Sequence, residues 1–361
     1  MTSYRYKRIA VKVGSNVLAG PEGDLDLKSL SSIVRQVSSL QQAGVEVILV
    51  SSGAVASGRN VVKPTRKLDA VDQRQLFSAV GQAILINEYY SLFRKNGLTC
   101  GQVLTTKENF QSRRHYLNQK NCMTLMLENG IIPIVNENDT ISVTELMFTD
   151  NDELSGLIAS MMDAEALIIL SNVDGIYNGH PDDPETSVIR TIHPGEDLKQ
   201  YIAPEKSTFG RGGMLTKTTI ARKVAEEGIE VYIANGKKPA ILTGLLDCSK
   251  DIVCTHFVAG NKASSAIKKW IAHSEGFAKG EIHINEGCLS ALLDKDASSL
   301  LPVGVTSIEG IFEKGDIVKI FDPSGHQIGV GKAQYGSASA IDLIGKKGQK
   351  PLVHYDYLYL D

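Results

Sequence analysis

The sequence predicts an α/β sandwich with a mainly parallel sheet, followed by a small, mostly β domain. Strand-like and helix-like segments alternate over the first 260 residues, as they do when helices connect parallel strands. Several strand segments are near-continuous apolar runs, which is typical of a sheet covered on both faces. From Glu281 onward the pattern changes to short strands separated by glycine turns. A chain of 361 residues is long enough for the two domains that this change indicates.

The first strand–helix–strand unit begins close to the N-terminus. RIAVKV at 8–13 is a short β-branched run that ends at Gly14. Residues 28–43 carry apolar side chains at helical spacing, and Gly44 stands where a helix-terminating glycine belongs. VEVILV at 45–50 is the next strand, and it ends in the loop SSGAVASG. Both strands therefore end in loops rich in glycine and serine.

The alternation continues to about residue 260, with a long irregular stretch at 172–212. The further strands are expected at VLTT (103–106), IIPIVN (131–136), ALIILS (166–171) and EVYIAN (230–235). The further helices are expected near 113–129, 152–162 and 214–227. The sequence thus predicts repeated strand–helix units in one sheet.

The change in pattern places a first domain at 1–260, a linker at 261–277 and a second domain at 278–361. Charge divides in the same way. Residues 276–361 hold eight lysines, no arginine and eleven acidic residues, for a net charge of −3, whereas residues 1–275 are balanced. The C-terminal quarter therefore carries the whole net charge of the chain.

Composition excludes several classes of protein. The 38 Lys and Arg residues against 41 Asp and Glu residues argue against a polyanion-binding protein. No apolar run approaches the roughly 18 residues of a membrane span, and MTSYRYKRIA lacks the apolar core of a signal peptide. The five cysteines are scattered without CxxC spacing, which indicates neither a disulfide framework nor a zinc site. We therefore expect a cytoplasmic protein.

Ligands of open α/β sheets bind outside the carboxyl ends of the strands, so the loops there are the expected ligand-binding segments. These loops are KVGSN (12–16), SSGAVASG (51–58), VNENDT (135–140), FTDND (148–152), SNVDG (171–175) and GRGGMLTK (210–217). Their backbone N–H groups can approach anionic oxygens, and Lys12 and Lys217 add two cations. The sequence therefore predicts a phosphate-binding site, although Leu215 breaks both the Walker A and the GxGxxG patterns.

The order and content of these loops resemble the amino-acid kinase superfamily, and most closely its glutamate 5-kinase family. The matching strings are VKVGSN, VSSGAVASGR, VGQ at 80–82, VNENDT, DNDELSGLIA and GRGGMLTK. KKWIAHS and the segment after it resemble the linker and PUA domain of the longer members. The resemblance covers nearly the whole chain, and it implies a three-layer amino-acid kinase fold with a PUA-like domain appended.

The resemblance also implies roles for particular residues. Lys12 and Lys217 are expected to contact the ATP phosphates and Asp152 to organise both lysines, so these three form the implied catalytic set. Further ATP contacts are implied for Gly14, Ser171, Asn172, Arg211, Gly212, Gly213 and Met214. Glutamate contacts are implied for Ser52, Gly53, Asp139 and Asn151. Many members carry Thr-Asp where this chain has Ser171 and Asn172, so it departs from the family pattern there. No side chain is assigned to a metal, because Mg²⁺ is expected to arrive on the ATP phosphates.

Each of these assignments has a structural alternative. Lys12 can be a solvated charge at a strand end, and Lys217 can be a surface lysine. Asp152 can be the N-cap of the helix that follows it. Asp139 can be a turn residue, and Ser52 can belong to a tight turn.

The chemistry of the residues fits the activity that the resemblance implies. A carboxyl group with a pKa of about 4.3, such as that of glutamate, is an ionised nucleophile at neutral pH and needs no general base. Phosphoryl transfer then requires positioning and charge stabilisation, which two lysines, backbone N–H groups and Mg²⁺ can provide. We expect ATP-dependent conversion of L-glutamate to γ-glutamyl phosphate, the first step of proline biosynthesis.

The resemblance further implies proline as a feedback inhibitor, a homo-oligomer and a glutamyl phosphate reductase as partner. One alternative is a sibling kinase that acts on aspartate, N-acetylglutamate or UMP. A second alternative, from another class, is an RNA-binding protein that acts through the PUA-like domain. The acidic balance of residues 276–361 makes RNA binding the less favoured hypothesis.

Overall fold

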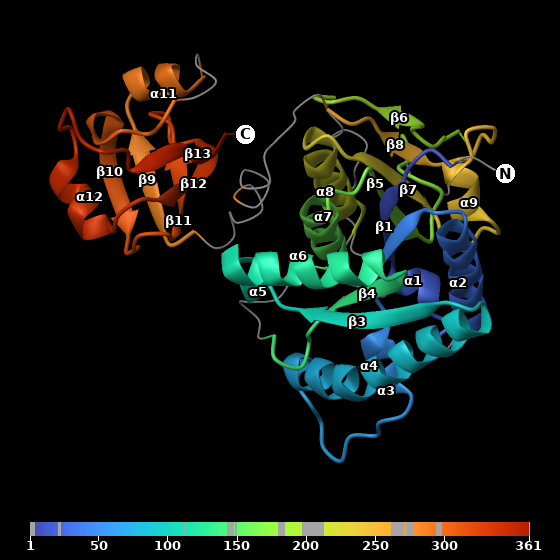
Figure 1. Cartoon of the computed structure of the whole chain (residues 1–361). Coiled ribbons are helices and arrows are strands. Elements are labelled where there is room, and N and C mark those ends of the chain that lie inside the picture. The colour runs from blue at the N-terminus through green and yellow to red at the C-terminus, as the bar shows by residue number, and fades with distance from the viewer. Residues whose placement is uncertain are drawn as a thin grey trace. The chain divides into compact units, whose positions relative to one another are not determined.

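The structure is a computed structural model, and it divides into two compact units, Met1–Ala263 and Ser264–Asp361 (Figure 1). It describes residues 4–20, 23–111, 113–142, 148, 150–179, 185–196, 213–260, 271, 278–293 and 298–360. The expected linker at 261–277 lies outside the described residues apart from Ile271, so its boundaries remain a prediction. Each unit has a sheet and a core of its own.

An eight-stranded sheet forms the centre of the first unit. Its order is β3-β4-β2-β1-β5-β7-β8-β6, and every pairing is parallel except that of β7 with β8. The strands are β1 (Arg8–Val13), β2 (Glu46–Ser51), β3 (Thr99–Thr105), β4 (Ile131–Glu137), β5 (Ala166–Ser171), β6 (Thr191–Ile192), β7 (Glu230–Asn235) and β8 (Thr255–Phe257). The prediction of a mainly parallel sheet is confirmed. The strands that follow β1 as far as β4 lie on one side of it in the sheet, and the strands that follow β5 lie on the other side. The boundary between β1 and β5 is therefore the switch point at which such sheets bind ligands.

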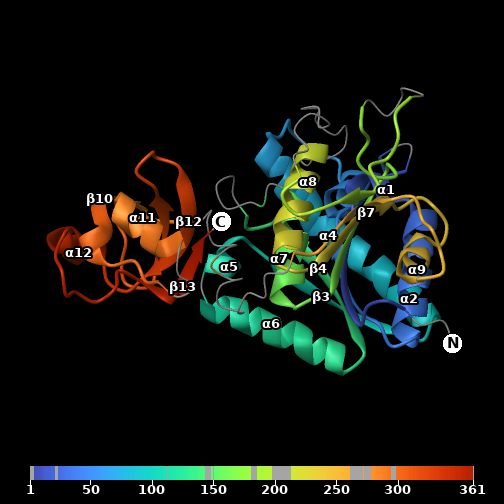
Figure 2. The same cartoon turned by 90° about the horizontal axis from the view of Figure 1, so that it is seen from above.

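Helices cover both faces of this sheet. They are α1 (Ser15–Leu18), α2 (Leu27–Gln42), α3 (Ala54–Arg59), α4 (Ala70–Lys95), α5 (Glu108–Gln111), α6 (Arg113–Glu128), α7 (Asn151–Met161), α8 (Met214–Glu226) and α9 (Ile241–Leu246). Successive residues of β1 point to different cores: Val11 packs in one core with Leu30 of α2, and Ala10 packs in the other with Ala159 of α7. Figure 2 shows α2 and α9 on one side of the central strands and α7 and α8 on the other. The expected three-layer arrangement is confirmed.

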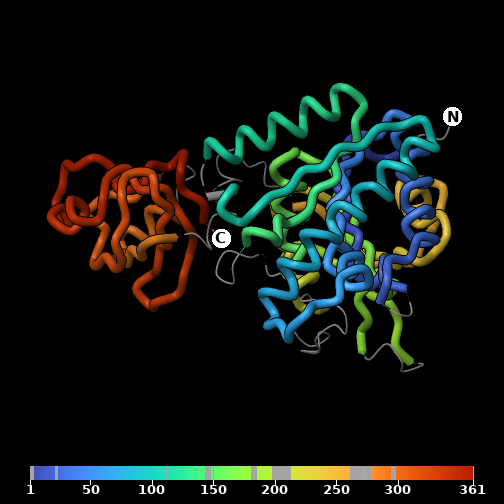
Figure 3. Tube along the Cα trace, turned by 90° about the horizontal axis from the view of Figure 1, so that it is seen from below, coloured from blue at the N-terminus to red at the C-terminus, as the bar shows by residue number. Residues whose placement is uncertain are grey.

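The long helix α4 lies in a part of the chain for which the sequence analysis predicts no element. Its fully buried apolar residues form a single row along the helix, and a glycine interrupts this row. The buried positions of this row are Phe77, Gly81, Leu85, Tyr89 and Phe93. A Cβ atom at Gly81 would overlap the carbonyl oxygen of Ala54, so the close packing of α3 on α4 requires glycine here. Figure 3 shows α4 and α6 on opposite sides of β3 and β4.

The second unit contains a five-stranded sheet with the order β10-β9-β11-β12-β13. The strands are β9 (Gly280–Ile284), β10 (Val305–Gly310), β11 (Ile317–Phe321), β12 (Gln327–Ala333) and β13 (Val353–Leu360). Two short helices, α11 (Glu286–Leu293) and α12 (Ser337–Leu343), accompany the sheet, and Ile282 and Ile284 point into its core. The prediction of a small, mostly β domain is confirmed. In the described part of both units, no helix is long and apolar enough to cross a membrane.

Candidate active site

A pocket of about 810 Å³ lies at the carboxyl ends of β1, β2, β4 and β5. It occupies the position at which open α/β sheets bind ligands. Every described residue of the predicted site lines it: Lys12, Gly14, Ser52, Gly53, Asp139, Asn151, Asp152, Ser171, Asn172, Gly213, Met214 and Lys217. The two remaining predicted residues, Arg211 and Gly212, lie outside the described residues. Loops from six parts of the sequence thus meet in one pocket.

Three charged side chains from different elements form what we call the lysine cluster: Lys12, Asp152 and Lys217. The Nζ atom of Lys12, on β1, lies 2.5 Å from Oδ1 of Asp152, and the Nζ atom of Lys217, on α8, lies 3.0 Å from Oδ2. Asp152 is fully buried in the first turn of α7, and Lys12 is only 5% exposed. Lys12 is therefore not a solvated charge at a strand end, and Lys217 is not an ordinary surface lysine.

The lysine cluster fixes the charge state of Asp152. Burial by itself would raise the pKa of this carboxyl group, but the charges and hydrogen bonds of Lys12 and Lys217 outweigh burial and hold the pKa below its ordinary value. The carboxylate therefore stays ionised and keeps the two ammonium groups near one point. Two cations held in this way suit a ligand with several negative oxygens.

Asp150, and not Asp152, is the N-cap of α7. Its Oδ1 atom accepts hydrogen bonds from the backbone N–H groups of Asp152 at 2.7 Å and Glu153 at 3.2 Å. The capping alternative for Asp152 is therefore wrong. Burial and the neighbouring charge of Asp152 raise the pKa of Asp150 to about 6. No role was predicted for Asp150, although it is the first residue of the DND string.

Two backbone features lie beside the lysine cluster. A Cβ atom at Gly14 would lie 2.9 Å from the carbonyl oxygen of Leu170, which accepts a hydrogen bond from the Gly14 N–H group at 3.1 Å. Only glycine fits without displacing the backbone of the adjacent strand. On the other side, α8 begins after Gly213, which provides no side-chain cap. The positive end of this helix therefore reinforces Lys217 in its first turn.

An amide network joins three of the pocket's loops. The Nδ2 group of Asn151 donates to Oγ of Ser52 at 3.0 Å and to Oδ1 of Asn136 at 3.0 Å. Asn136 in turn donates to Oε1 of Gln82 at 2.8 Å. The structure thus brings Ser52 and Asn151 together, as their shared role implies. No role was predicted for Asn136 or Gln82, although they lie in the strings VNENDT and VGQ.

A second charged group, here called the arginine cluster, consists of Arg74, Glu137 and Asp139. Nε of Arg74 donates to Oδ1 of Asp139 at 2.5 Å, and its Nη2 donates to Oε2 of Glu137 at 3.1 Å. Burial, reinforced by the charge of Asp139, raises the pKa of Glu137. Asp139 is 7% exposed and ion-paired, so it is not merely a turn residue. Arg74 was not predicted as a site residue, because it lies on helix α4, which was itself not predicted.

Ser171 and Asn172 end β5 beside the lysine cluster. The side-chain hydroxyl of Ser171 donates to Oδ1 of Asn172 at 3.4 Å. The backbone carbonyl oxygen of Ser171 accepts a hydrogen bond from the Gly236 N–H group at 2.8 Å. Ser171 is nearly buried, whereas Asn172 is exposed at the rim of the pocket. This pair can therefore offer polar atoms to a ligand that enters from the solvent.

The pocket thus offers two ammonium groups to phosphate oxygens. It also offers the amide and hydroxyl groups of the amide network and the carboxylates of Glu137 and Asp139. Among the described residues, it contains no group of three or more side chains placed to hold a metal ion. This arrangement suits phosphoryl transfer between two bound substrates, because that reaction depends on positioning and charge stabilisation.

Comparisons with known proteins cover both units. The model of the amino acid kinase family matches residues 7–235, and that of the PUA domain matches residues 280–355. A curated glutamate 5-kinase of Bacteroides thetaiotaomicron is 68% identical, over 99% of this chain and 99% of its own length. Another, of Chlorobaculum tepidum, is 50% identical over 98% of both chains. That of Trichlorobacter lovleyi is 36% identical, over 97% of this chain and 93% of its own.

Proposed function

The chain belongs to the amino acid kinase family, and on this basis we propose that it transfers the γ-phosphoryl group of ATP to the γ-carboxylate of L-glutamate. The product is γ-glutamyl phosphate. The full-length similarity to curated glutamate 5-kinases supports this substrate pair. The observation that carries the proposal is the lysine cluster, in which two cations share the buried Asp152. The same pocket also holds the residues that are expected to bind glutamate.

The proposed reaction is an in-line displacement. A carboxylate oxygen of glutamate attacks the γ-phosphorus, the bond between that phosphorus and the β,γ-bridging oxygen breaks, and ADP leaves with the bond's electrons. The attacking carboxylate, with an ordinary pKa of about 4.3, is already ionised, so no general base is required. Lys12 and Lys217 stabilise charge on the transferred group and on the leaving oxygen. Asp152 keeps both lysines in place and does not itself react.

On the nucleotide side, Gly14 leaves room for the phosphates beside the lysine cluster, and the open N-terminus of α8 after Gly213 gives them backbone N–H groups. Ser171, Asn172 and Met214 contact the rest of the nucleotide, and Lys12 and Lys217 contact its phosphates. The same role is proposed for Arg211 and Gly212, which lie outside the described residues. The open N-terminus of α8 and the glycine-only position at residue 14 support this side of the proposal.

On the amino-acid side, Asn151, Ser52 and Gly53 bind and orient glutamate. Asp139 attracts its ammonium group, and Arg74 holds Asp139 in position. The hydrogen bond from Asn151 to Ser52 supports a shared binding wall for this substrate. Carboxylate, amide and hydroxyl groups around one amino acid allow recognition of its charged ends and of its side-chain length.

Mg²⁺ is proposed as the companion of ATP, held mainly by the phosphate oxygens. The protein atom that fits such an ion best is Oδ2 of Asp150, which is buried without a hydrogen-bond partner. When bound, the ion would neutralise charge on the phosphates, and the residues named above would do the positioning.

The remaining biological setting follows from the same family. We propose that the reaction is the first step of proline biosynthesis, that proline inhibits it and that the chain forms a homo-oligomer. An acyl phosphate hydrolyses readily, so a glutamyl phosphate reductase is the proposed partner. The proposed kinase domain spans 1–260 and the PUA-like domain 278–361, with the linker between them.

The experiment that tests the proposal is hydroxylamine trapping of the acyl phosphate with a panel of acceptors. With ATP and Mg²⁺, L-glutamate should give the γ-hydroxamate, and aspartate, N-acetylglutamate and UMP should give little or no product. ADP release measured in parallel would reveal transfer to UMP, which forms no hydroxamate. A preference for any acceptor over glutamate would replace the proposed substrate, and a lack of turnover with all of them would reject the proposal.

A further inference from the structure

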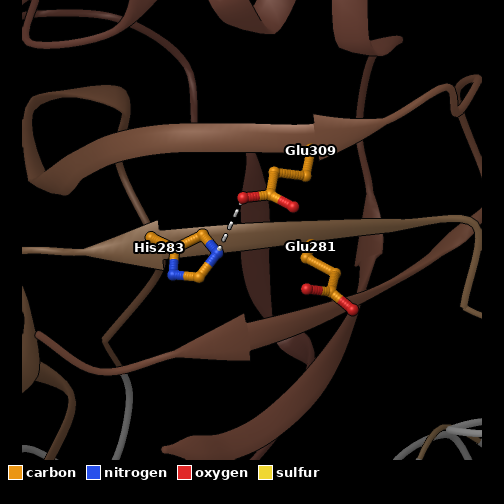
Figure 4. Close-up of side chains that lie close together, drawn as sticks. All are labelled: Glu281, His283 and Glu309. Carbon is orange, nitrogen blue, oxygen red and sulfur yellow. Dashed lines mark ion pairs between the residues drawn. The ribbon is translucent and has the colours of Figure 1, made fainter. Parts of the chain in front are cut away.

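A group of metal-ligating side chains lies on the second unit, apart from the kinase pocket. Glu281 and His283 are on β9, and Glu309 is on the neighbouring strand β10 (Figure 4). Ile282 and Ile284 point into the core, so the alternation of the strand puts Glu281 and His283 on the opposite face of the sheet. We call these three residues the β9–β10 cluster.

Two negative charges oppose each other in this cluster. In the antiparallel ladder, Glu281 pairs directly with Glu309. Like charges directly opposite each other destabilise a sheet unless something neutralises them. Lys319 of β11 stands opposite Glu281 on its other side, yet among the described residues it forms no ion pair with Glu281. The arrangement therefore calls for another positive charge.

His283 presents an unused ligand atom to the same point. Its ring stacks on Phe321, with the two ring centroids 5.1 Å apart and the planes at 20°, which holds the imidazole in one orientation. Its Nε2 atom is buried and has no hydrogen-bond partner. That atom faces Oε1 of Glu309 at 3.8 Å, too far for a hydrogen bond (Figure 4).

The geometry points to a divalent cation site, and we propose that the β9–β10 cluster binds Zn²⁺ through Nε2 of His283 and one carboxylate oxygen from each glutamate. The three ligand atoms lie within 4.8 Å of one another. Two atoms that share a tetrahedral zinc ion lie about 3.4 Å apart, as follows from bonds of about 2.0–2.1 Å. The Glu309 side chain is 69% exposed and can rotate to close the remaining gap.

The donor set favours zinc over the other common divalent ions. Imidazole nitrogen suits Zn²⁺, whereas Mg²⁺ and Ca²⁺ prefer oxygen ligands alone. Three protein ligands leave the fourth position to water. The bound ion would neutralise the opposed glutamates and join β9 to β10 through side chains as well as backbone hydrogen bonds. The site is independent of the proposed kinase activity.

The test is zinc titration of the metal-stripped full chain by calorimetry, with three substitutions. Glu309→Gln and His283→Gln each remove a ligand, and each should weaken zinc binding at this site at least tenfold. His326→Gln is the matched control, because His326 also lies beside a carboxylate, Asp322 at 3.7 Å, but is 81% exposed and outside the cluster. It should bind zinc as the unsubstituted chain does. Replacement by Co²⁺ should give visible absorption that only the two cluster variants lose.

Thermal unfolding provides a readout that a merely structural role would not produce. Without metal, Glu309→Gln should be at least as stable as the unsubstituted chain, because it removes the opposed charge. With zinc, the unsubstituted chain should gain stability and the variant should not. The proposal is overturned if the full chain binds no stoichiometric zinc, or if both cluster variants bind it as tightly as the His326→Gln control does.

Discussion

The lysine cluster and the arginine cluster line the same pocket with inverted charge. In the first, the ammonium groups of Lys12 and Lys217 share the single carboxylate of Asp152. In the second, the one guanidinium of Arg74 lies between the carboxylates of Glu137 and Asp139. One cluster therefore carries an excess positive charge and the other an excess negative charge.

The difference shows how one pocket can distinguish two anionic substrates. The excess positive charge of the lysine cluster suits phosphate oxygens, whereas the excess negative charge of the arginine cluster suits an ammonium group. Glutamate carries such a group and ATP does not. Because each cluster is paired internally, its charges stay buried and oriented before a ligand arrives, and little reorganisation is needed during the reaction.

Removal of Lys217 should produce the largest effect, because it takes one of the two cations from the transferred phosphoryl group. For Lys217→Ala we expect kcat to fall about 10²- to 10³-fold, the usual loss for one preorganised charge-stabilising group. Steady-state kinetics with both substrates measures this. Lys223→Ala, in the last turn of the same helix and outside the pocket, should leave kcat unchanged. Near-normal turnover of Lys217→Ala would remove the lysine cluster from the mechanism.

Asp152→Asn should show how far the stability of the first unit depends on the carboxylate of the lysine cluster. The substitution leaves two largely buried ammonium groups without their carboxylate, and loss of one partner of a buried pair costs about 3–5 kcal/mol. We expect a clearly lower Tm for the first unit, partly restored by inorganic phosphate, which can pair with the lysines. Asp163→Asn breaks the exposed pair with Lys120 and should hardly change Tm. An unchanged Tm in Asp152→Asn would mean that the lysines do not depend on this carboxylate.

Asp139→Ala tests the proposed role of the arginine cluster in binding glutamate. Loss of a charge-assisted contact of about 1.5–3 kcal/mol should raise the KM for glutamate about 10- to 100-fold. The KM for ATP should stay within about twofold, because the lysine cluster is untouched. Initial rates with each substrate varied in turn separate the two constants. An effect confined to ATP would contradict the division of the pocket into two charge types.

The two clusters also differ in how far the sequence predicted them. Lys12 and Lys217 lie in glycine-rich strings that end a strand or begin a helix, so position and residue type together indicated a phosphate site, whereas the role of Asp152 was implied by the resemblance alone. Arg74 lies on α4, whose single row of fully buried apolar residues is interrupted by Gly81 and gives a weak helical signal. Its contact with Asp139 depends on how α4 packs beside the sheet, and residue spacing does not encode that packing. The strands and layers were predictable because apolar periodicity is local, whereas side-chain pairs between distant elements are not.

Asp150 allows the smallest and most specific test, because it borders the lysine cluster without an ion pair among the described residues. Its pKa is raised to about 6 in the folded chain, mainly by burial and then by Asp152. The folded state therefore holds the proton more tightly than the unfolded state, and the stability contributed by protonated Asp150 is lost as the pH rises from about 4 through 6. Asp150→Asn cannot ionise but remains a good N-cap.

The Tm of Asp150→Asn relative to that of the unsubstituted chain should therefore be higher at pH 7 than at pH 4.5. Asp152, whose pKa is lowered, acts in the opposite direction at lower pH, and it is present in both proteins, so most of its contribution cancels in the difference. Thermal unfolding at pH 4.5, 6 and 7 measures the change. A Tm difference that stays constant over this range would mean that burial and the charge of Asp152 do not raise the pKa of Asp150 in the folded chain.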